Sequence, residues 1–353
     1  MMRAVRFYEY GGPEVLRLEE HPIPEPGSGE VLLRVVATSV RRTDLGQRSG
    51  KGDFFKSTLP FQLGRESSGV VAALGAGVSG WREGDEAVTK NNSACGECRN
   101  CLAGAPEACL HMRYQGVSAW GGYADYITLP ARTLLRKPPS VGHAEAAGFQ
   151  GGTITAWHSL VDQAKLQPGE TVLIPSATGA VGSGGVAVAK YVGARVIASV
   201  RGADKARRIK PFGADEAMDY ETEDVGQRVR DLTGGRGADV LFDTVGGPEF
   251  QDRARLIRPN GRIVMPGAAA GNQLSLSMNA MIANQATLHF SKGSRPEEAD
   301  TVLGLLASGE LKVAYSHVFP LEEAAEAHRA IERREPIGRV LLDVAGVGIT
   351  PSI

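Results

Sequence analysis

The 353-residue sequence has few cysteines, few aromatic residues and almost no net charge. Its 39 basic and 40 acidic residues leave a net charge of −1, which excludes the strong positive field typical of proteins that bind nucleic acid or an anionic membrane. Because 42% of the residues are hydrophobic, general disorder is also excluded. At roughly 150 residues per domain, the length predicts two or three domains. We expect a small molecule as the partner, and neither nucleic acid nor a membrane.

The sequence also lacks a recognisable targeting or membrane segment. Met1–Arg6 contains no apolar core of signal-peptide length. Thr171–Ala189 carries no charge, but it holds four glycines and Pro175, so we interpret it as a strand, a glycine turn and a helix. All four cysteines lie between Cys95 and Cys109, whereas a secreted disulfide scaffold would distribute them along the chain. We therefore expect a soluble, cytoplasmic protein.

Two patterns follow each other along the chain. The first 130 residues contain strand candidates between glycine and proline groups, at residues 31–37, 69–74 and 124–129. From about residue 145, apolar strands alternate with helices, which is typical of a parallel, doubly wound sheet. These strand candidates are 171–174, 195–200, 239–242, 262–265 and 288–290, and the helix candidates are 182–191, 204–211 and 222–232. Two helices (297–308 and 321–332) and a strand (338–343) are predicted near the end.

Glycine is abundant, and one group of glycines has a specific context. The strand at 171–174 is followed by the turn Ala177–Gly182 and then by a helical run. Glycines in such a turn let the backbone N–H groups around Gly179, Ala180 and Val181 approach a pyrophosphate at the N-terminus of the helix. We predict a dinucleotide-binding site at this turn.

The end of the next strand indicates which dinucleotide binds. NAD sites place an acidic residue there for the ribose hydroxyl, whereas NADP sites provide cations and hydroxyls for the 2′-phosphate. The chain has no acid at the strand tip, and Ser199, Arg201 and Lys205 are placed to bind a phosphate. We predict NADPH. NADH is the alternative if Arg201 and Lys205 are only solvated surface charges.

The four cysteines form a compact set with short spacings. Cys95, Cys98, Cys101 and Cys109 supply four thiolates within fifteen residues, which satisfies the tetrahedral preference of zinc and leaves no open coordination position. Redox-active thiols are the alternative, but two thiols suffice for that chemistry. We predict one structural zinc ion per chain.

Further motifs are spread over nearly the whole chain. They are Gly64-x-Glu66-x-x-Gly69-Val70-Val71, Gly84-Asp85-x-x-Val88, Thr155-Ala156-Trp157, Phe212-Gly213-Ala214-Asp215, Gly234-Gly235-Arg236-Gly237-Ala238-Asp239, Asp243-x-Val245-Gly246-Gly247 and Ile337-Gly338-Arg339-Val340. With the cysteines and the glycine turn, they resemble the medium-chain dehydrogenase/reductase superfamily of zinc alcohol dehydrogenases and quinone oxidoreductases. The resemblance implies an α/β protein with a β-rich GroES-like catalytic domain (1–152 and 296–353, with the zinc lobe at 91–112). It also implies a Rossmann domain with a doubly wound parallel sheet (153–295) and assembly as a homodimer or homotetramer.

The sequence departs from zinc alcohol dehydrogenases at the three ligands of their catalytic zinc. The resemblance aligns Arg41, Arg65 and Gly151 with those ligands. Guanidinium groups repel a cation and have no lone pair to donate, so we expect no catalytic zinc. Arg41 or Arg65 is then a candidate to stabilise a developing oxyanion, and Thr43 is a candidate proton relay. Two alternatives remain open: the arginines pair with Asp44 and Glu66, with Asp44 to Arg65 as the favoured pair, or they select an acidic substrate.

The resemblance also implies a set of cofactor contacts. Thr155 matches a threonine at the nicotinamide face, and Tyr220 resembles a residue beside the adenosine ribose. The remaining positions are Val245, Gly267, Ala268, Ser291, Lys292 and Arg339, the last of which matches a cation near the pyrophosphate.

Three functions are compatible with these features. The first hypothesis is an NADPH-dependent oxidoreductase that transfers hydride to a quinone or an α,β-unsaturated carbonyl compound without catalytic zinc. The second is a zinc-independent alcohol or carbonyl reductase with a specialised substrate, for example an acidic one. The third is an NADPH-binding protein whose catalysis has lapsed.

Overall fold

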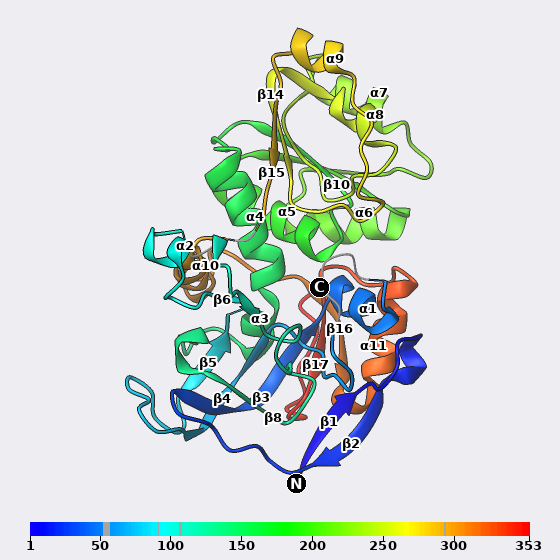
Figure 1. Cartoon of the computed structure of the whole chain (residues 1–353). Helices are drawn as coiled ribbons and strands as arrows, with labels where there is room; N and C mark the ends of the chain where they lie inside the picture. The colour runs from blue at the N-terminus through cyan, green and yellow to red at the C-terminus, as the bar shows by residue number, and fades with distance from the viewer. Residues whose placement is uncertain (52–56, 91, 106–107, 293) are drawn as a thin grey trace. The chain divides into compact units, whose positions relative to one another are not determined.

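The structure, a computed structural model, describes residues 1–51, 57–90, 92–105, 108–292 and 294–353. Three residues of the predicted lobe at 91–112, namely Asn91, Pro106 and Glu107, lie outside the described residues. The chain divides into two compact units (Figure 1). The first comprises Met1–Gln150, Leu306–Ser308 and Tyr315–Ser352, and the second comprises Gly151–Leu305, Gly309–Ala314 and Ile353.

The first unit is rich in β-structure. A seven-stranded sheet has the order β16-β17-β3-β4-β5-β9, with β8 pairing with β3, and short two-stranded sheets join β1 to β2 and β6 to β7. The strands are β1 (Met2–Arg6), β2 (Arg17–His21), β3 (Glu30–Val40), β4 (Ser67–Leu74), β5 (Glu86–Thr89), β6 (Asn92–Ser93), β7 (Arg113–Tyr114), β8 (Tyr126–Pro130), β9 (Leu134–Arg136), β16 (Tyr315–Pro320) and β17 (Arg339–Asp343). The helices are η1 (Pro13–Val15), α1 (Arg42–Ser49), α2 (Arg99–Leu102), η3 (Ala131–Thr133), α3 (His143–Gly148), η7 (Leu321–Glu323) and α11 (Ala324–Glu332).

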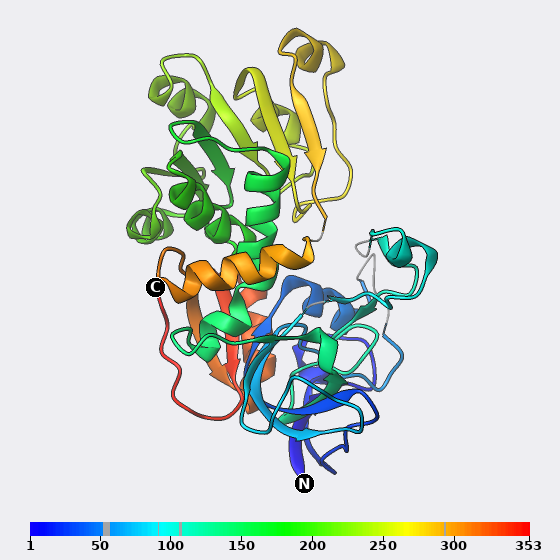
Figure 2. The same ribbon diagram turned by 90° about the vertical axis from the view of Figure 1, so that its left-hand side faces the viewer.

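The second unit is a doubly wound parallel sheet with the order β12-β11-β10-β13-β14-β15. Figure 2 shows the arrows of this sheet pointing the same way. Its strands are β10 (Thr171–Pro175), β11 (Arg195–Val200), β12 (Glu216–Asp219), β13 (Ala238–Phe242), β14 (Ile257–Met265) and β15 (Thr287–Phe290). Its helices are α4 (Thr155–Trp157), η5 (His158–Gln163), α5 (Ala180–Val192), α6 (Ala203–Ile209), η6 (Lys210–Phe212), α7 (Val225–Leu232), α8 (Phe250–Ala254) and α9 (Met278–Ala283).

The chain passes from β10 outward to β12 and then returns to β13, so the strand order reverses between β10 and β13. Ligands of such sheets bind beyond the carboxyl ends of the strands at this point.

The predicted α/β fold class, with a β-rich unit and a parallel doubly wound unit, is confirmed. The main segment of the first unit ends at Gln150, two residues before the boundary predicted from the sequence, where the π-helix η4 (Gln150–Ile154) begins. Helix α10 (Pro296–Ala307) was assigned to the catalytic domain, but it belongs to the second unit up to Leu305. A buried contact of 3.0 Å between Glu298 Oε1 and His158 Nδ1 fixes this helix to η5, which explains the difference.

None of the helices in the described part of the chain combines the length and the apolar character that a membrane crossing requires.

Candidate functional site

The first candidate site lies where strand β3 ends and helix α1 begins. Arg41 is the N-cap residue of α1, and its backbone N–H donates a hydrogen bond of 2.8 Å to the Asp44 carboxylate. Asp44 is the third residue of the helix, and its carboxylate therefore caps the first turn by accepting from a backbone N–H at the start of the helix. This local contact fixes the backbone from which the Arg41 side chain extends.

Glu66 accepts contacts from two arginines. Its Oε1 lies 3.0 Å from Arg41 Nη1 and its Oε2 lies 2.7 Å from Arg339 Nη2, while the Ser39 hydroxyl donates to Oε2 at 2.9 Å. Glu66 is completely buried, whereas 18% of the Arg41 side chain remains exposed. Arg339 Nε also donates to the Gly148 carbonyl at 2.7 Å. Burial of a carboxylate is tolerated when charged donors satisfy it in this way.

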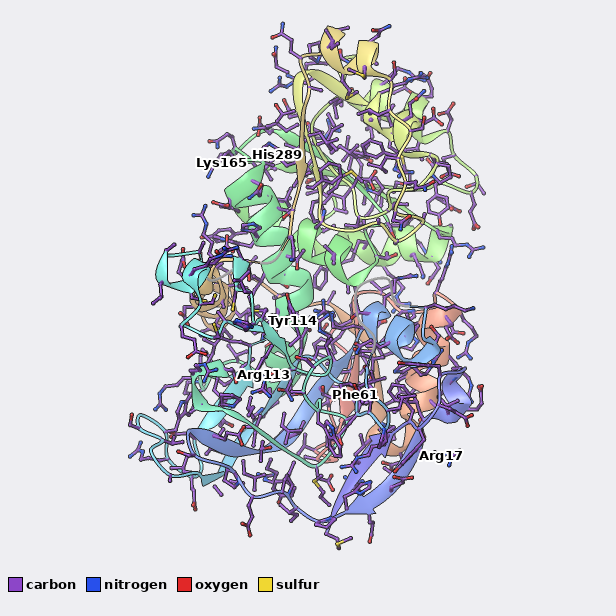
Figure 3. The ribbon with its side chains drawn as sticks, in the orientation of Figure 1. Arg17, Phe61, Arg113, Tyr114, Lys165 and His289 are labelled. Carbon is purple, nitrogen blue, oxygen red and sulfur yellow. The ribbon has the colours of Figure 1, made fainter. Side chains whose placement is uncertain are left out.

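Asp44 caps α1 through its contact with the backbone N–H of Arg41, and the opposite charges of Asp44 and Arg65 influence each other, so the expected pair between these two residues stays a prediction. Burial raises the pKa of Asp44 to about 6. Burial, followed by the like charge of Arg41, lowers the pKa of Arg65 to about 10. The Arg65 guanidinium carbon lies 5.5 Å from the ring centre of Tyr114, which Figure 3 labels. We call Arg41, Asp44, Arg65, Glu66 and Arg339 the arginine cluster.

Other residues predicted from the sequence lie around or apart from this cluster. Thr43 is exposed in the first turn of α1, so its hydroxyl is accessible to solvent. Gly151 lies in η4 at the start of the second unit. Arg339 is 3% exposed and directs its donors at Glu66 and Gly148, so its contact with a pyrophosphate stays a prediction.

The second candidate site lies at the carboxyl end of β10, where helix α5 begins. Gly179 is the N-cap residue of α5, and the first N–H groups of a helix have no partner within the helix. A Cβ atom added at Gly182 would overlap the Ser176 carbonyl oxygen and lie 2.9 Å from Ala177 Cα. Glycine at this position therefore lets the helix approach the strand closely, as the predicted dinucleotide turn requires.

Replacing Gly182 with alanine is expected to destabilise the protein by about 1–3 kcal/mol, because the new methyl group has no space against backbone atoms. Cofactor affinity should fall as well, since the helix N-terminus must shift. Thermal unfolding and fluorescence titration with NADPH measure the two effects. Gly304→Ala is the matched control, because nothing lies within 4 Å of its added Cβ. Equal losses of stability and of cofactor affinity in Gly182→Ala and Gly304→Ala would contradict the role of Gly182 in the close approach of α5 to β10.

The loops that follow β13 and β14 are connected by hydrogen bonds. Asp243 is fully buried and accepts from the backbone N–H groups of Val245 (2.7 Å) and Gly246 (2.9 Å), while Arg253 Nε donates to its other oxygen at 2.8 Å. The Val245 carbonyl accepts from the N–H of Ala270 at 2.8 Å. Val245 is thus brought beside the exposed loop that contains Gly267 and Ala268, and the contact of these residues with a cofactor stays a prediction.

Thr155 and Ser291 are brought together by a residue that the sequence interpretation missed. The Ser159 hydroxyl contacts the Thr155 carbonyl at 2.7 Å and the Ser291 hydroxyl at 2.9 Å. Lys292 follows Ser291 and is exposed. The i to i+4 spacing of Thr155 and Ser159 within the helical segment could have indicated this contact.

The predicted phosphate contacts lie at the carboxyl ends of β11 and β12. Ser199 is buried at the end of β11, Tyr220 is 44% exposed after β12, and Lys205 lies in α6. Arg201 Nε is 2.7 Å from Glu221 Oε1, and this hydrogen bond raises the pKa of Arg201. The sequence interpretation missed Glu221 because this acid follows the neighbouring strand rather than β11.

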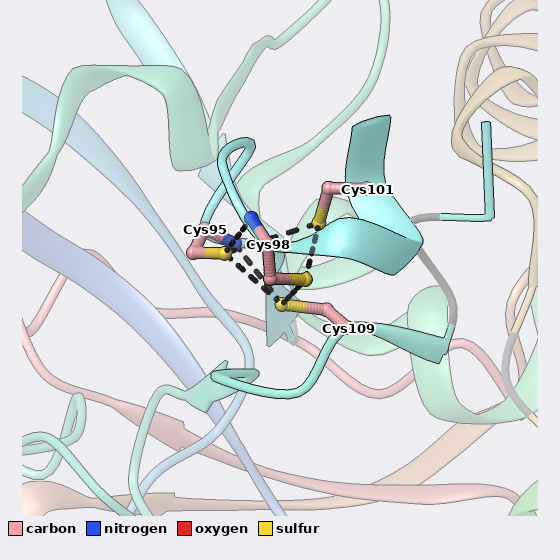
Figure 4. Close-up of side chains that lie close together, drawn as sticks. All are labelled: Cys95, Cys98, Cys101 and Cys109. Atoms are coloured by element: carbon pink, nitrogen blue, oxygen red, sulfur yellow. Dashed lines mark hydrogen bonds between the residues drawn. The ribbon is translucent and has the colours of Figure 1, made fainter. Parts of the chain in front are cut away.

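The four cysteines converge on one point (Figure 4). Their sulfur atoms are separated by 3.5 Å (Cys98–Cys101), 3.6 Å (Cys95–Cys109) and 3.9 Å (Cys95–Cys101 and Cys98–Cys109). A tetrahedral zinc–thiolate site with bonds of about 2.3 Å requires sulfur atoms about 3.8 Å apart. Hydrogen bonds from backbone N–H groups lower the pKa of Cys98 to about 6, which favours the thiolate. The thiols therefore fit a zinc ion.

His158, Asp162 and Glu298 form a second group with metal-binding side chains in the described part of the chain. Cations already neutralise it, since Arg295 Nη2 and Lys165 Nζ lie 3.0 and 3.5 Å from Asp162 Oδ1. We therefore assign this group to the attachment of α10 to η5, with no ligand.

A buried polar network that the sequence did not predict connects α1 with α11. Arg48 donates to His328 Nδ1 (3.0 Å), and His328 Nε2 lies 3.0 Å from the Tyr123 hydroxyl. Arg48 also lies 2.6 Å from Glu332. Burial, with the charge of Arg48, lowers the pKa of His328 to about 3, so the imidazole is neutral.

The six-stranded parallel sheet, the glycine turn at its switch point and the β-rich unit define a dinucleotide-dependent oxidoreductase. The alcohol dehydrogenase GroES-like domain family matches residues 27–139, and the zinc-binding dehydrogenase family matches residues 180–308. The chain therefore belongs to the medium-chain dehydrogenase/reductase superfamily and is an NAD(P)H-dependent oxidoreductase.

Similar proteins match the chain from end to end. A solved structure of an NAD-dependent alcohol dehydrogenase is 38% identical, has a TM-score of 0.91, and the match covers 97% of this chain and 99% of that one. A quinone oxidoreductase from Pseudomonas aeruginosa is 29% identical over 97% of this chain and 99% of its own length. A 2-haloacrylate reductase from Burkholderia sp. is 28% identical with the same coverage.

Proposed function

We propose that the protein is an NADPH-dependent reductase of quinones or α,β-unsaturated carbonyl compounds that operates without a catalytic zinc ion. The observation that carries this proposal is the arginine cluster, because the resemblance aligns Arg41 and Arg65 with two ligands of the catalytic zinc in alcohol dehydrogenases, and a guanidinium group has no lone pair to donate to a metal ion. The similarity to a quinone oxidoreductase and a 2-haloacrylate reductase supports a conjugated acceptor.

The residues of the cluster suit a reaction in which charge develops on an oxygen atom. NADPH supplies a hydride when it is bound, and a conjugated acceptor spreads the resulting charge onto an enolate or phenolate oxygen. The Arg41 guanidinium, held by Glu66 and partly exposed, stabilises that oxygen electrostatically. Buried Arg65 adds positive charge, and the exposed Thr43 hydroxyl exchanges the proton with water.

Two measurements on the purified protein test this proposal. We expect oxidation of NADPH with 9,10-phenanthrenequinone or a small enone, together with one zinc ion per chain, held by the four cysteines. Reduction of simple ketones alone would instead favour the alcohol dehydrogenase chemistry of the solved relative. Tight binding of NADPH without turnover of any acceptor would indicate lapsed catalysis, and two zinc ions per chain would contradict zinc independence.

Replacing Arg201 with alanine is expected to weaken NADPH binding roughly 10- to 100-fold, because a charge-assisted contact with the 2′-phosphate is lost. Binding of NADH should change less than about twofold, since it has no such phosphate. The ion pair between Arg201 and Glu221 does not prevent Arg201 from contacting the 2′-phosphate, because exposed ion pairs contribute little stability. Fluorescence titration measures both affinities. Arg207→Ala, at another exposed arginine of the same region, is the control, and equal losses for both cofactors would contradict the assignment.

The exposed edge of the second unit supports assembly into a homodimer. Phe290 on edge strand β15 is 70% exposed, and Met278 and Ile282 of α9 are 73% and 68% exposed. Apolar side chains and an unpaired strand edge favour association with another copy. Light scattering in solution should give twice the mass of the chain, or four times if dimers pair further.

A further inference from the structure

We propose that Glu221 determines how strongly the protein prefers NADPH over NADH, because its carboxylate accepts a hydrogen bond from the ribose 2′-hydroxyl of NADH and repels the 2′-phosphate of NADPH. This inference rests on the proposed function, since it concerns the cofactor of that reductase. The residues that carry it all belong to the second compact unit, at the carboxyl ends of β11 and β12.

Asp219, the last residue of β12, holds Glu221 at the end of the neighbouring strand. Its Oδ1 accepts from the backbone N–H of Gly202, which follows β11, at 2.8 Å and from the N–H of Glu221 at 3.1 Å. The parallel pairing of the two strands sets Asp219 opposite Val200. Asp219 is buried, and the hydrogen bonds from these N–H groups lower its pKa, which keeps it ionised. Glu221 is therefore fixed beside the end of β11, although it follows β12 in the sequence.

Glu221 and Arg201 present an anion and a cation to solvent at the end of β11. Arg201 Nε lies 2.7 Å from Glu221 Oε1, and the two side chains are 50% and 44% exposed. The nearby acid Glu223 is engaged differently, since its Oε1 accepts from the backbone N–H of Asp219 at 2.8 Å. A carboxylate offers several acceptor positions, so Glu221 can accept from a hydroxyl group while Arg201 remains bound to Oε1.

The two cofactors differ only at the ribose 2′ position, and the two charges have opposite effects there. The 2′-hydroxyl of NADH donates a hydrogen bond, which a carboxylate accepts in a charge-assisted contact. The 2′-phosphate of NADPH is an anion, so it attracts Arg201 and repels Glu221. The phosphate must also compete with Glu221 for the guanidinium group. Arg201 thus favours NADPH, Glu221 favours NADH, and we expect the protein to bind both cofactors.

Replacing Glu221 with glutamine removes the negative charge and keeps the shape of the side chain. Binding of NADPH should become about 3- to 10-fold tighter, because Arg201 loses its competing partner and the phosphate is no longer repelled. Binding of NADH should become about 3- to 10-fold weaker, because the hydroxyl loses a charged acceptor. Fluorescence titration measures both affinities. Asp204→Asn is the matched control, since this exposed acid lies 3.0 Å from Arg207, and it should leave the ratio of the two affinities unchanged within about twofold.

A merely structural role for Glu221 predicts a different result. Weaker binding of both cofactors by the same factor would assign Glu221 to the support of its loop and would overturn the inference. Two fragments locate the effect, since 2′,5′-ADP and 5′-AMP differ only in the 2′-phosphate and lack the nicotinamide. In calorimetric titrations, Glu221→Gln should bind 2′,5′-ADP more tightly and 5′-AMP more weakly than the unmodified protein. Cofactor affinities that change while those of the fragments do not would contradict a contact at the ribose.

Turnover separates this inference from the proposed function. Reduction of a quinone or an enone with NADPH, together with an unchanged ratio of affinities in Glu221→Gln, would overturn the inference and leave the proposed function standing. A changed ratio without turnover of any acceptor would support the role of Glu221 and overturn the reductase.

Discussion

Replacing Cys98 with serine is expected to abolish the binding of the zinc ion that we predict at the four cysteines. The four sulfur atoms lie 3.5–3.9 Å apart along the contacts that join them, which suits one tetrahedral ion, and a neutral hydroxyl is a much weaker zinc ligand than a thiolate. Because Cys98 precedes α2 directly, the loop around it should lose its anchor. Metal analysis after gel filtration measures the first effect, and the rate of cleavage by a protease measures the second.

Leu102→Ser is the matched control for this variant. Leu102 lies in α2 and is 76% exposed, so the change introduces a hydroxyl in the same lobe without touching a ligand. Zinc content and protease resistance should stay at the level of the unmodified protein. Retention of a full zinc ion by Cys98→Ser would show that the four cysteines are not the ligand set.

Features with a local physical cause were predictable from the sequence. The strand at 195–200 has the predicted bounds because an apolar run of that length is buried on both faces of a parallel sheet. The glycine turn was also recognisable, since only a residue without Cβ fits between α5 and β10. In contrast, β12 (Glu216–Asp219) is short and partly charged, so no apolar run indicated it.

Pairing between distant residues was not predictable. The sequence interpretation paired Asp44 with Arg65 by analogy with a metal site and did not predict that Asp44 closes the first turn of α1. Arg339 pairs with Glu66 across 273 positions of sequence, because β17 and β4 both pair with β3 and so bring the start of β17 close to the residue that precedes β4. Hydrophobic patterns define strands and helices, but they do not specify which polar side chains meet after the sheet has formed.

Replacing Arg48 with alanine is expected to lower the free energy of unfolding by about 3–5 kcal/mol, because it removes one partner of a buried charged network. The guanidinium donates to the Gly11 carbonyl at 3.1 Å, to His328 Nδ1 at 3.0 Å and to Glu332 at 2.6 Å. Since Arg48 can only donate, Nδ1 of the neutral His328 must accept, and the proton of the imidazole lies on Nε2, directed at Tyr123. Truncation of Arg48 therefore leaves Nδ1 of His328 without a donor and creates a cavity beside it. Denaturant unfolding measures the loss.

Two further variants determine whether the network or the mere loss of volume causes this effect. Arg34→Ala, at an exposed arginine of β3, should change the free energy of unfolding by no more than about 0.5 kcal/mol. Tyr123→Phe keeps the buried ring and removes only the hydroxyl. The Nε2 proton of His328 then has no acceptor, which should lower the free energy of unfolding by about 1–3 kcal/mol. Because Arg48 and Tyr123 both act through His328, the double variant should lose less than the two single losses together. Strict additivity would contradict a shared network and would assign the stability of this region to packing alone.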